Sequence, residues 1–255
     1  MNDWGDFLHL SQIWLWHGFL IFVRVGAALS LMPGFGEQSV PAQVKLGLAI
    51  AATLATAPLI QPFGGDPWVL SSGVRYIATE TLSGLMCGIG LRFFIFALQT
   101  AGAIAAQSTS LSQILGASAE PMPAIGHLLV IGGLALAMVT GLHVKFLIYL
   151  TESYELLPPG HFPLVSVVTE WGIGQVTHSF SLALRLAAPF VIISLLYNLA
   201  LGAINRAMPQ LMVAFVGAPA ITAGGLVLLA LLTPVILWAW IEAMQIYLNT
   251  FGWAE

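Results

Sequence analysis

The residues with the most chemical potential in this chain are isolated charges inside long apolar segments. Six charged side chains lie within or beside such segments: Arg24, Glu80, Arg92, Lys145, Arg185 and Glu242. A charge in hydrocarbon is costly, so these residues pair, face a bundle interior or extend to the membrane surface. We therefore expect Glu80 to form a buried ion pair with one of the arginines. The alternative, a proton relay, usually needs an acid deep within a span, whereas Glu80 and Glu242 lie near predicted span edges.

Signatures of catalysis and of metal binding are not found in the sequence. The motifs G-x-S-x-G, H-E-x-x-H and G-K-[ST] do not occur, and no two of the six histidines stand three or four residues apart. The closest acidic pair, Glu152 and Glu155, lies beside Pro158 in an expected loop, and we interpret it as the solvated end of the fourth apolar segment. The single cysteine, Cys87, excludes an internal disulfide and a Cys-ligated metal centre. We therefore predict a protein that is not an enzyme and has no cofactor or metal site.

The overall composition is that of a membrane protein. Of 255 residues, 58% are hydrophobic and 7% are charged, whereas a soluble domain carries about 25% charged residues. So few charges cannot cover a water-facing surface of this size. The net charge of −4 and the absence of a Lys/Arg cluster argue against nucleic acid as a partner, because phosphate binding needs clustered positive charge.

The charges described above belong to about six apolar segments, each near or above the roughly 20 residues that a spanning helix needs. These segments are residues 13–32, 44–60, 69–98, 125–150, 180–204 and 211–241. The last would form a helix of about 46 Å, against a hydrocarbon core of about 30 Å. We expect breaks at Pro219 and Pro234, and Pro189 lies inside the fifth segment. The sequence thus predicts an all-α membrane protein with bent or broken helices in one domain, residues 1–255.

The stretch between the third and fourth segments is polar but uncharged. Residues 93–119 contain no Asp, Glu, Lys or Arg, and they are rich in alanine, serine and glutamine. Neutral polar side chains can face water or a passing peptide without binding either charge sign strongly, so this stretch is a candidate for lining or closing a pore. The alternatives are a flexible surface loop or close packing of small residues between helices. The candidate residues are Gln107, Ser108, Ser110, Ser112, Gln113 and Gly116.

Two longer motifs are more specific than any single residue. The first begins with an arginine in a helix, continues through a Pro-Gly turn and ends at Val-Pro before the next helix; its markers are Arg24, Pro33, Gly36 and Pro41. The second is a helix, a basic turn and a new helix after Pro-Gln; its markers are Asn198, Gly202, Arg206, Pro209, Gln210, Gly217 and Pro219. A glycine-rich helix from Glu80 to Arg92 and an Arg185-Leu-Ala-Ala-Pro189 run complete the pattern.

In their order and spacing these motifs resemble the FliR family of flagellar type III export-gate proteins, and its relatives in injectisomes, over nearly the whole chain. The resemblance implies bent helical hairpins and a pore-forming structural subunit of the bacterial inner membrane, within the flagellar basal body. It also implies a gate shared with FliP and FliQ homologues, associated with FlhB and FlhA homologues, through which unfolded flagellar subunits pass. Membrane lipid would surround the gate.

The resemblance further assigns roles to residues. The polar stretch, about residues 102–122 and including Met122, would be a plug that closes the pore. The motif residues, with Glu80, Arg92 and Arg185, would serve structure and assembly. The sequence leaves open two other functions, which are a secondary transporter of a small solute and the equivalent component of an injectisome.

Overall fold

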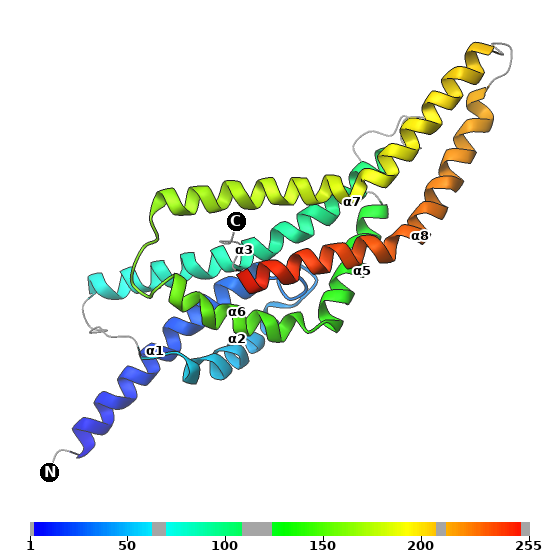
Figure 1. Cartoon of the computed structure of the whole chain (residues 1–255). Helices are drawn as coiled ribbons and strands as arrows, with labels where there is room; N and C mark the ends of the chain where they lie inside the picture. Colours follow the sequence, from blue (N-terminus) through cyan, green and yellow to red (C-terminus); the bar gives the residue numbers. More distant parts are fainter. Residues whose placement is uncertain (1–2, 63–69, 109–123, 208–212, 251–255) are drawn as a thin grey trace. The chain divides into compact units, whose positions relative to one another are not determined.

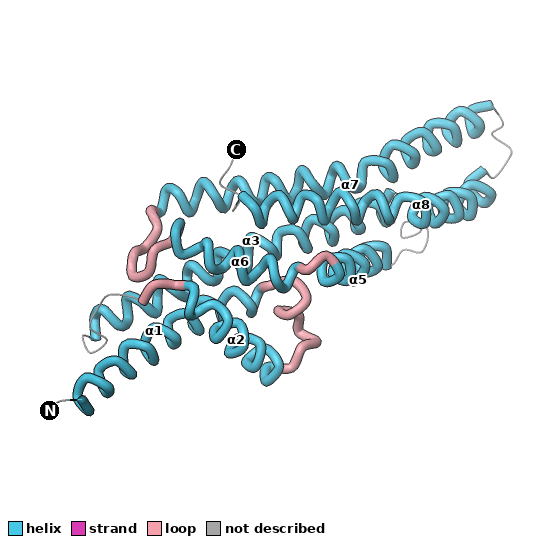
Figure 2. The backbone as a smooth tube through the Cα atoms, turned by 60° about the horizontal axis from the view of Figure 1, so that its bottom comes forward, coloured by secondary structure: helices cyan, strands magenta, loops and turns pink. Residues whose placement is uncertain are grey.

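The fold is built from helices throughout the residues that the structure, a computed structural model, describes: 3–62, 70–108, 124–207 and 213–250. No strand occurs within these ranges, so the prediction of an all-α protein is confirmed (Figures 1 and 2). The helices are α1 (Asp3–Leu31), α2 (Ala42–Thr56), the short 3-10 helix η1 (Ala57–Leu59), α3 (Leu70–Ser108), α5 (Ala124–Val139), α6 (Leu142–Leu156), α7 (Val165–Ala207) and α8 (Val213–Thr250).

The membrane prediction is also confirmed. Five stretches of helix in the described residues are long and apolar enough to cross a bilayer, and the bent pair α5 and α6 makes a sixth if it counts as one span. The stretches within α3 and α7 have 37 and 43 residues. Both exceed the roughly 20 residues that cross a hydrocarbon core, so these helices must tilt, curve or extend beyond it.

The helices do not break at the prolines where breaks were expected. Helix α7 continues through Pro189, and α8 runs uninterrupted past positions 219 and 234. Figure 1 shows both helices curving along their length rather than stopping. A proline removes one hydrogen bond and bends a helix without having to end it. The observed break instead separates α5 from α6 at Gly141, whose φ of +81° ends the right-handed helical path. The fourth predicted segment is therefore two helices.

Three predicted boundaries were also wrong. Helix α3 continues to Ser108, well past residue 98, and α7 begins at Val165 rather than near residue 180. Glu152 and Glu155 lie in the last turns of α6 rather than in a loop, and both are exposed, as expected for the solvated end of the fourth segment. Polar character was mistaken for the end of a helix in each case. Ser108, for example, donates its hydroxyl to the Ala105 carbonyl at 2.9 Å, which lets a polar residue remain helical.

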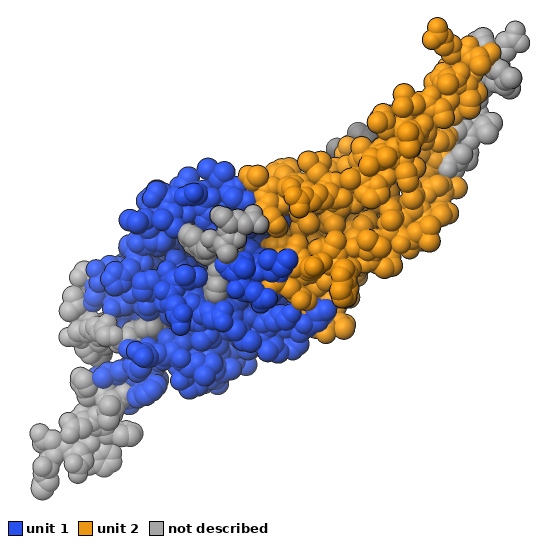
Figure 3. All heavy atoms as spheres, in the orientation of Figure 1, with its two compact units in different colours: residues 1–93, 140–175, 246–255 blue, residues 94–139, 176–245 orange. Residues whose placement is uncertain are grey.

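The described chain groups into two compact units (Figure 3). Unit 1 comprises residues 1–93, 140–175 and 246–255, and unit 2 comprises residues 94–139 and 176–245. Each is considered separately below. The prediction of one membrane-embedded domain stays a prediction, because this grouping does not test it.

Both units rely on glycines where helices approach closely. In unit 1 a Cβ added at Gly84 of α3 would lie 2.2 Å from the Arg24 carbonyl oxygen of α1. In unit 2 a Cβ at Gly102 of α3 would lie 2.2 Å from the Gly126 Cα of α5. No side chain fits at such distances, so glycine is required at these two crossings. The first crossing places Arg24 directly against α3.

Candidate functional site

The core of unit 1 contains a fully buried arginine. Arg24, on α1, has no exposed surface, and its guanidinium donates four hydrogen bonds. Nε and one terminal nitrogen donate to the two Glu80 carboxylate oxygens of α3, at 2.8 and 3.1 Å. The remaining two bonds reach the Ser153 hydroxyl at 3.1 Å and the Leu157 carbonyl at 2.8 Å. The guanidinium carbon also lies 3.6 Å from the centre of the Tyr154 ring.

This arrangement joins three helices through one side chain. Arg24 comes from α1, Glu80 from α3, and Ser153 and Tyr154 from α6. The predicted buried pair between Glu80 and an arginine is therefore confirmed, and Arg24 is the partner. Both carboxylate oxygens of Glu80 are engaged by the same guanidinium, which is the bidentate geometry that holds a charge pair most firmly. The geometry favours a structural role for Glu80 over the proton relay considered from the sequence.

Sequence reasoning missed Ser153 and Tyr154 as parts of this network. Both lie between Glu152 and Pro158, a run in which only the acidic pair Glu152 and Glu155 was considered from the sequence. In a helix Ser153 and Leu157 are four residues apart and fall on one face. A polar residue on an otherwise apolar helical face was the available signal, because a buried hydroxyl needs a partner.

A second ion pair fastens the connection between α1 and α2. Arg92 of α3 donates to the two Glu37 carboxylate oxygens at 2.5 and 3.5 Å, with side chains 23% and 27% exposed. Lys45 of α2 donates to the Gly36 carbonyl at 3.1 Å. A Cβ at Gly36 would lie 2.6 Å from the Ser30 carbonyl oxygen, so this turn is tight. Pro33 is buried, and Pro41 immediately precedes α2.

The predicted residue Arg92 therefore acts with Glu37, which the sequence-based candidates did not include. Glu37 stands within the same motif as Pro33 and Gly36, and its charge is opposite to that of Arg92. Motif membership combined with opposite charge could have identified the pair. The result is a loop that is held to α3 by charge and to α2 by a lysine.

The candidate plug residues lie only partly within the described chain. Gln107 and Ser108 form the end of α3 in unit 2, where Gln107 is exposed and Ser108 half-buried. The Ser108 carbonyl accepts a hydrogen bond from the Ser194 hydroxyl of α7 at 2.5 Å. Ser110, Ser112, Gln113, Gly116 and Met122 lie outside the described residues. Whether this stretch forms a plug stays a prediction.

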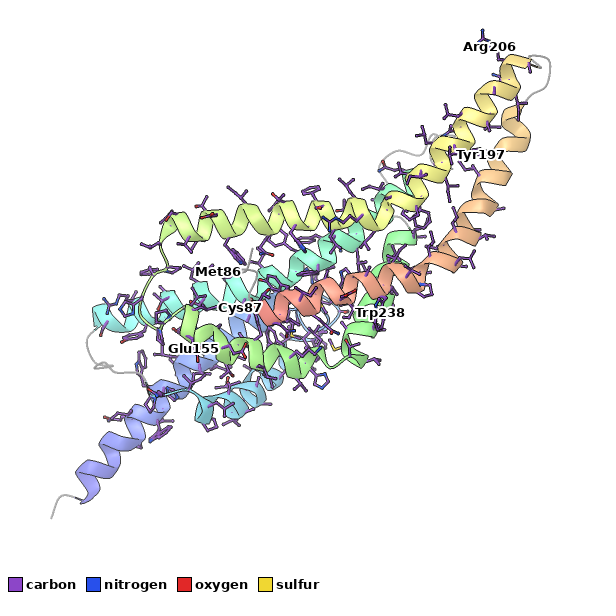
Figure 4. All side chains as sticks on the ribbon, viewed as in Figure 1. Met86, Cys87, Glu155, Tyr197, Arg206 and Trp238 are labelled. Carbon is purple, nitrogen blue, oxygen red and sulfur yellow. The ribbon has the colours of Figure 1, made fainter. Side chains whose placement is uncertain are left out.

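Of the remaining motif residues, those whose surroundings the structure describes are spread along α7. Arg185, Asn198, Gly202 and Arg206 are exposed along α7, and Figure 4 shows Arg206 at the end of that helix with its side chain pointing away from the ribbon. Asn198 donates to the Ser194 hydroxyl at 3.4 Å. Pro209 and Gln210 lie outside the described residues, while Gly217 and Pro219 fall in α8, where their surroundings are not described.

A small cleft in unit 1 lies beside the arginine network. It is lined by Met86, Cys87, Tyr149, Ser153, Leu156, Leu157 and Trp171, of which Met86 and Cys87 can be followed on α3 in Figure 4. Within the described residues no three His, Cys, Asp or Glu side chains lie close enough to hold a metal ion. Four charged side chains of unit 1 instead form two ion pairs, Arg24 with Glu80 and Arg92 with Glu37.

Long apolar helices joined by a buried ion pair define a multi-pass helical membrane protein. The family described as bacterial export proteins, family 1, matches residues 15–246. The chain belongs to this family, which includes the flagellar biosynthetic protein FliR, and the resemblance noted from the sequence is confirmed.

Three curated relatives show how much of the chain the similarity covers. FliR of Caulobacter vibrioides is 37% identical, over 91% of this chain and 94% of the relative. FliR of Escherichia coli is 33% identical over 88% and 86%, and FliR of Aquifex aeolicus is 28% identical over 85% of each chain. The protein is thus a membrane-embedded flagellar protein of the export apparatus, with a part in flagellum biogenesis and protein transport. Its family is a structural component of that apparatus rather than a known enzyme.

Proposed function

We propose that this protein is a pore-forming structural subunit of the flagellar type III export gate in the bacterial inner membrane. In this role it would help to move unfolded flagellar subunits across the membrane. The observation that carries the proposal is the family match over residues 15–246, together with a FliR relative that aligns over 91% of this chain and 94% of its own length. The partners would be FliP and FliQ homologues within the gate, and FlhB and FlhA homologues associated with it.

The surface of the long helices supports membership of a larger assembly in a membrane. Many large apolar side chains on α7 and α8 are exposed, including Phe180, Leu184, Ile192, Leu195, Leu199, Leu226, Leu231, Val235 and Trp238. Exposed apolar surface of this extent needs lipid or partner subunits against it. Both would be present for a subunit inserted among other helical chains of a gate.

The buried network of unit 1 would give this subunit a fixed shape. An ion pair at the junction of three helices can be satisfied in few arrangements, because both oxygens and four N–H groups must find their partners together. Arg24 and Glu80 would therefore act in assembly by setting the helix arrangement that partner subunits meet. The Arg92–Glu37 pair would fix the loop of residues 32–41 in the same way.

The uncharged stretch after α3 would close the pore. Alanine, serine, glycine and glutamine pack closely and form no salt bridge, so the stretch could be displaced by a passing chain at modest cost. We expect a deletion of residues 110–116 to leave assembly intact and to make cells permeable to small ions. Sodium influx into cells that carry the deletion on the chromosome measures this, with the same cells carrying the intact gene as the control. Influx at the control level would refute the closing role.

Membership of the gate has its own test. A tagged copy of the chain should purify from flagellated cells together with FliP and FliQ homologues, at a defined stoichiometry by native mass spectrometry. Removal of the gene should stop secretion of flagellar subunits into the medium. If the chain purifies alone and moves a small solute across liposomes, it is a transporter and not a gate subunit.

A further inference from the structure

We infer that the exposed face of α7 and α8 in unit 2 lies against membrane lipid, and that Arg185 and Arg206 bind phosphate headgroups at the two surfaces of the bilayer. The inference deepens the proposed function, because it names lipid rather than a partner subunit as what covers this face, but it does not depend on the closing of a pore. All the residues that carry it belong to unit 2 and are described by the structure.

Two arginines bracket an uncharged length of α7 that matches the thickness of a bilayer. Arg185 and Arg206 are both exposed, and the 20 residues between them, 186–205, contain no Asp, Glu, Lys or Arg. Twenty residues of α-helix are about 30 Å long, which is the thickness of the hydrocarbon core of a typical bilayer. Neither arginine forms an ion pair among the described residues. Each can extend its guanidinium to a phosphate at the nearer membrane surface.

The exposed side chains of α7 change in character at Arg185. Before this position, the exposed residues of α7 in unit 2 include the polar side chains of Thr177 and His178. From 186 to 204 the one exposed polar side chain is that of Asn198, which donates a hydrogen bond back to its own helix. A surface with so few polar groups suits hydrocarbon better than water. Its large exposed side chains are Val191, Ile192, Ile193, Leu195, Leu196 and Leu199.

Helix α8 has a boundary of the same kind. From Ala223 to Ala239 its exposed residues are all apolar, glycine or proline. The first charged residue of the helix is Glu242, which is exposed. Just before it, Trp238 is 68% exposed. Tryptophan is enriched where hydrocarbon meets headgroups, because its ring is apolar and its N–H is polar. The lipid-facing surface of α8 therefore ends between Trp238 and Glu242.

Phe94 of α3 places the boundaries of α7 and α8 at one level. Its ring centroid lies 5.8 Å from that of His178 in α7, and its carbonyl accepts a hydrogen bond from Trp240 Nε1 of α8 at 2.8 Å. The two helices run in opposite directions (Figures 1 and 2). Arg185 is seven residues from His178, and Trp238 is two residues from Trp240, which are about 10 and 3 Å of helix. Both distances are small beside the roughly 30 Å of the hydrocarbon core, so one membrane surface serves both helices.

This placement fixes which exposed residues lie deepest in the bilayer. Leu195 lies ten residues beyond Arg185 and eleven before Arg206, about 15 Å from each. On α8, Leu226 lies 14 residues before Trp240, about 21 Å of helix. Both leucines therefore belong near the middle of the hydrocarbon core.

Spin labels on single added cysteines test the placement. Phe180→Cys, Leu195→Cys and Leu226→Cys are matched, because the native side chains are 59%, 60% and 60% exposed. The chain's own Cys87 is buried, so the unaltered chain is the blank for labelling. The full chain, with any subunits that copurify, is placed in vesicles of phosphatidylethanolamine and phosphatidylglycerol. Each label is tested for collisions with oxygen, which concentrates in hydrocarbon, and with a nickel chelate, which stays in water.

The two reagents separate lipid, protein and water as the surroundings of this face. The ratio of oxygen to nickel collisions should be roughly ten times higher at positions 195 and 226 than at 180, because a polar chelate enters hydrocarbon only at a large free-energy cost. Few collisions with either reagent at 195 and 226 would show that another chain covers the face, so the inference would fail while the proposed gate stands. Frequent nickel collisions there would show a water-facing surface and would also overturn the inference. If the chain purifies alone, gate membership fails, and the labels still decide the inference.

Arg185→Leu tests the phosphate contact itself. Without this charge the exposed apolar surface of α7 extends through Leu184 and Phe180, so the membrane surface moves toward His178. The label at position 180 should sink toward hydrocarbon by about one helical turn, or 5 Å. Arg185→Lys keeps the cation and should leave the label where it is. An unmoved label in Arg185→Leu would overturn the phosphate contact. Because the first experiment keeps Arg185, it decides the lipid placement even if this variant does not accumulate.

Discussion

The two units solve the same problem, polar groups inside an apolar protein, with different chemistry. Unit 1 buries a full charge pair, Arg24 and Glu80, at the meeting point of three helices. The polar contacts described for unit 2 are neutral: Ser194 and Trp240 donate to the backbone carbonyls of Ser108 and Phe94.

The difference indicates how firmly each unit holds its arrangement. A buried charge left without its partner is far more costly than a neutral carbonyl that loses one donor. Unit 1 is therefore expected to tolerate almost no rearrangement, whereas unit 2 can exchange single neutral bonds. This division suits the proposed subunit, in which one part is a fixed frame and the other leads to the proposed closing stretch.

The largest expected effect comes from breaking the buried pair in unit 1. Glu80→Leu leaves the Arg24 charge buried and unpaired, so the free energy of unfolding should fall by about 3–5 kcal/mol. The membrane level of the variant and its thermal unfolding in detergent measure this loss. The double variant Arg24→Met with Glu80→Leu removes both charges and should recover most of the stability. A double variant as unstable as the single one would contradict the charge explanation.

The next largest effect is expected from substituting the glycines at the two close helix crossings, one in each unit. Gly84→Ala in unit 1 and Gly102→Ala in unit 2 each force a methyl group into a backbone contact, and each should lower stability by about 1–3 kcal/mol. Gly202→Ala is the control, since nothing lies within 4 Å of the added Cβ. Thermal unfolding should rank the control above both variants. Equal melting temperatures for all three would show that the crossings are looser than described.

Unit 2 should respond more mildly when its indole bond is removed. Trp240 is fully buried and its Nε1 donates to the Phe94 carbonyl at 2.8 Å. Trp240→Phe keeps an aromatic ring but loses the donor, so we expect a loss of about 1 kcal/mol from the bond, with a further cost from the smaller ring. Thermal unfolding beside Glu80→Leu gives the comparison directly. If the two variants lose equal stability, the contrast between the units is wrong.

The smallest expected effect belongs to the partly exposed pair of Arg92 and Glu37. Solvent screens this pair, so Glu37→Gln should lower stability by only about 0.2–1 kcal/mol. The loss should shrink in high salt, because screening weakens exposed charges while the buried pair is little affected. Unfolding of Glu37→Gln and of the intact protein at low and high salt tests this. A loss of several kcal/mol that does not depend on salt would show that this pair behaves like the buried pair, which contradicts the contrast.

Much of the fold could be predicted because the thickness of the bilayer sets how long an apolar helix must be to cross it. The six apolar segments and the pairing of Glu80 with an arginine followed from the cost of exposing charge to hydrocarbon. The break at Gly141 could not be predicted in the same way. Glycine is common in this chain, and a positive φ at one of them depends on the packing of both flanking helices. The breaks expected at the prolines were wrong because a proline can bend a long helix without ending it.

The candidate site was predicted only in part because its contacts are distant in the sequence. Arg24 and Ser153 are 129 positions apart, and Ser108 and Ser194 are 86 apart. No local pattern encodes such pairs. Ser108 and Asn198 were among the candidates named from the sequence. Ser194 was not, because no motif distinguished it from the other serines of the chain.

The central claim is that an uncharged stretch after α3 closes an export pore to which this chain contributes. Conductance of the purified gate, with this chain and its partner subunits in a planar lipid bilayer, tests the claim most directly. The intact gate should hold its current near the baseline of the bare bilayer, and the gate lacking residues 110–116 should pass a steady ionic current. Identical baseline currents from both preparations would contradict it.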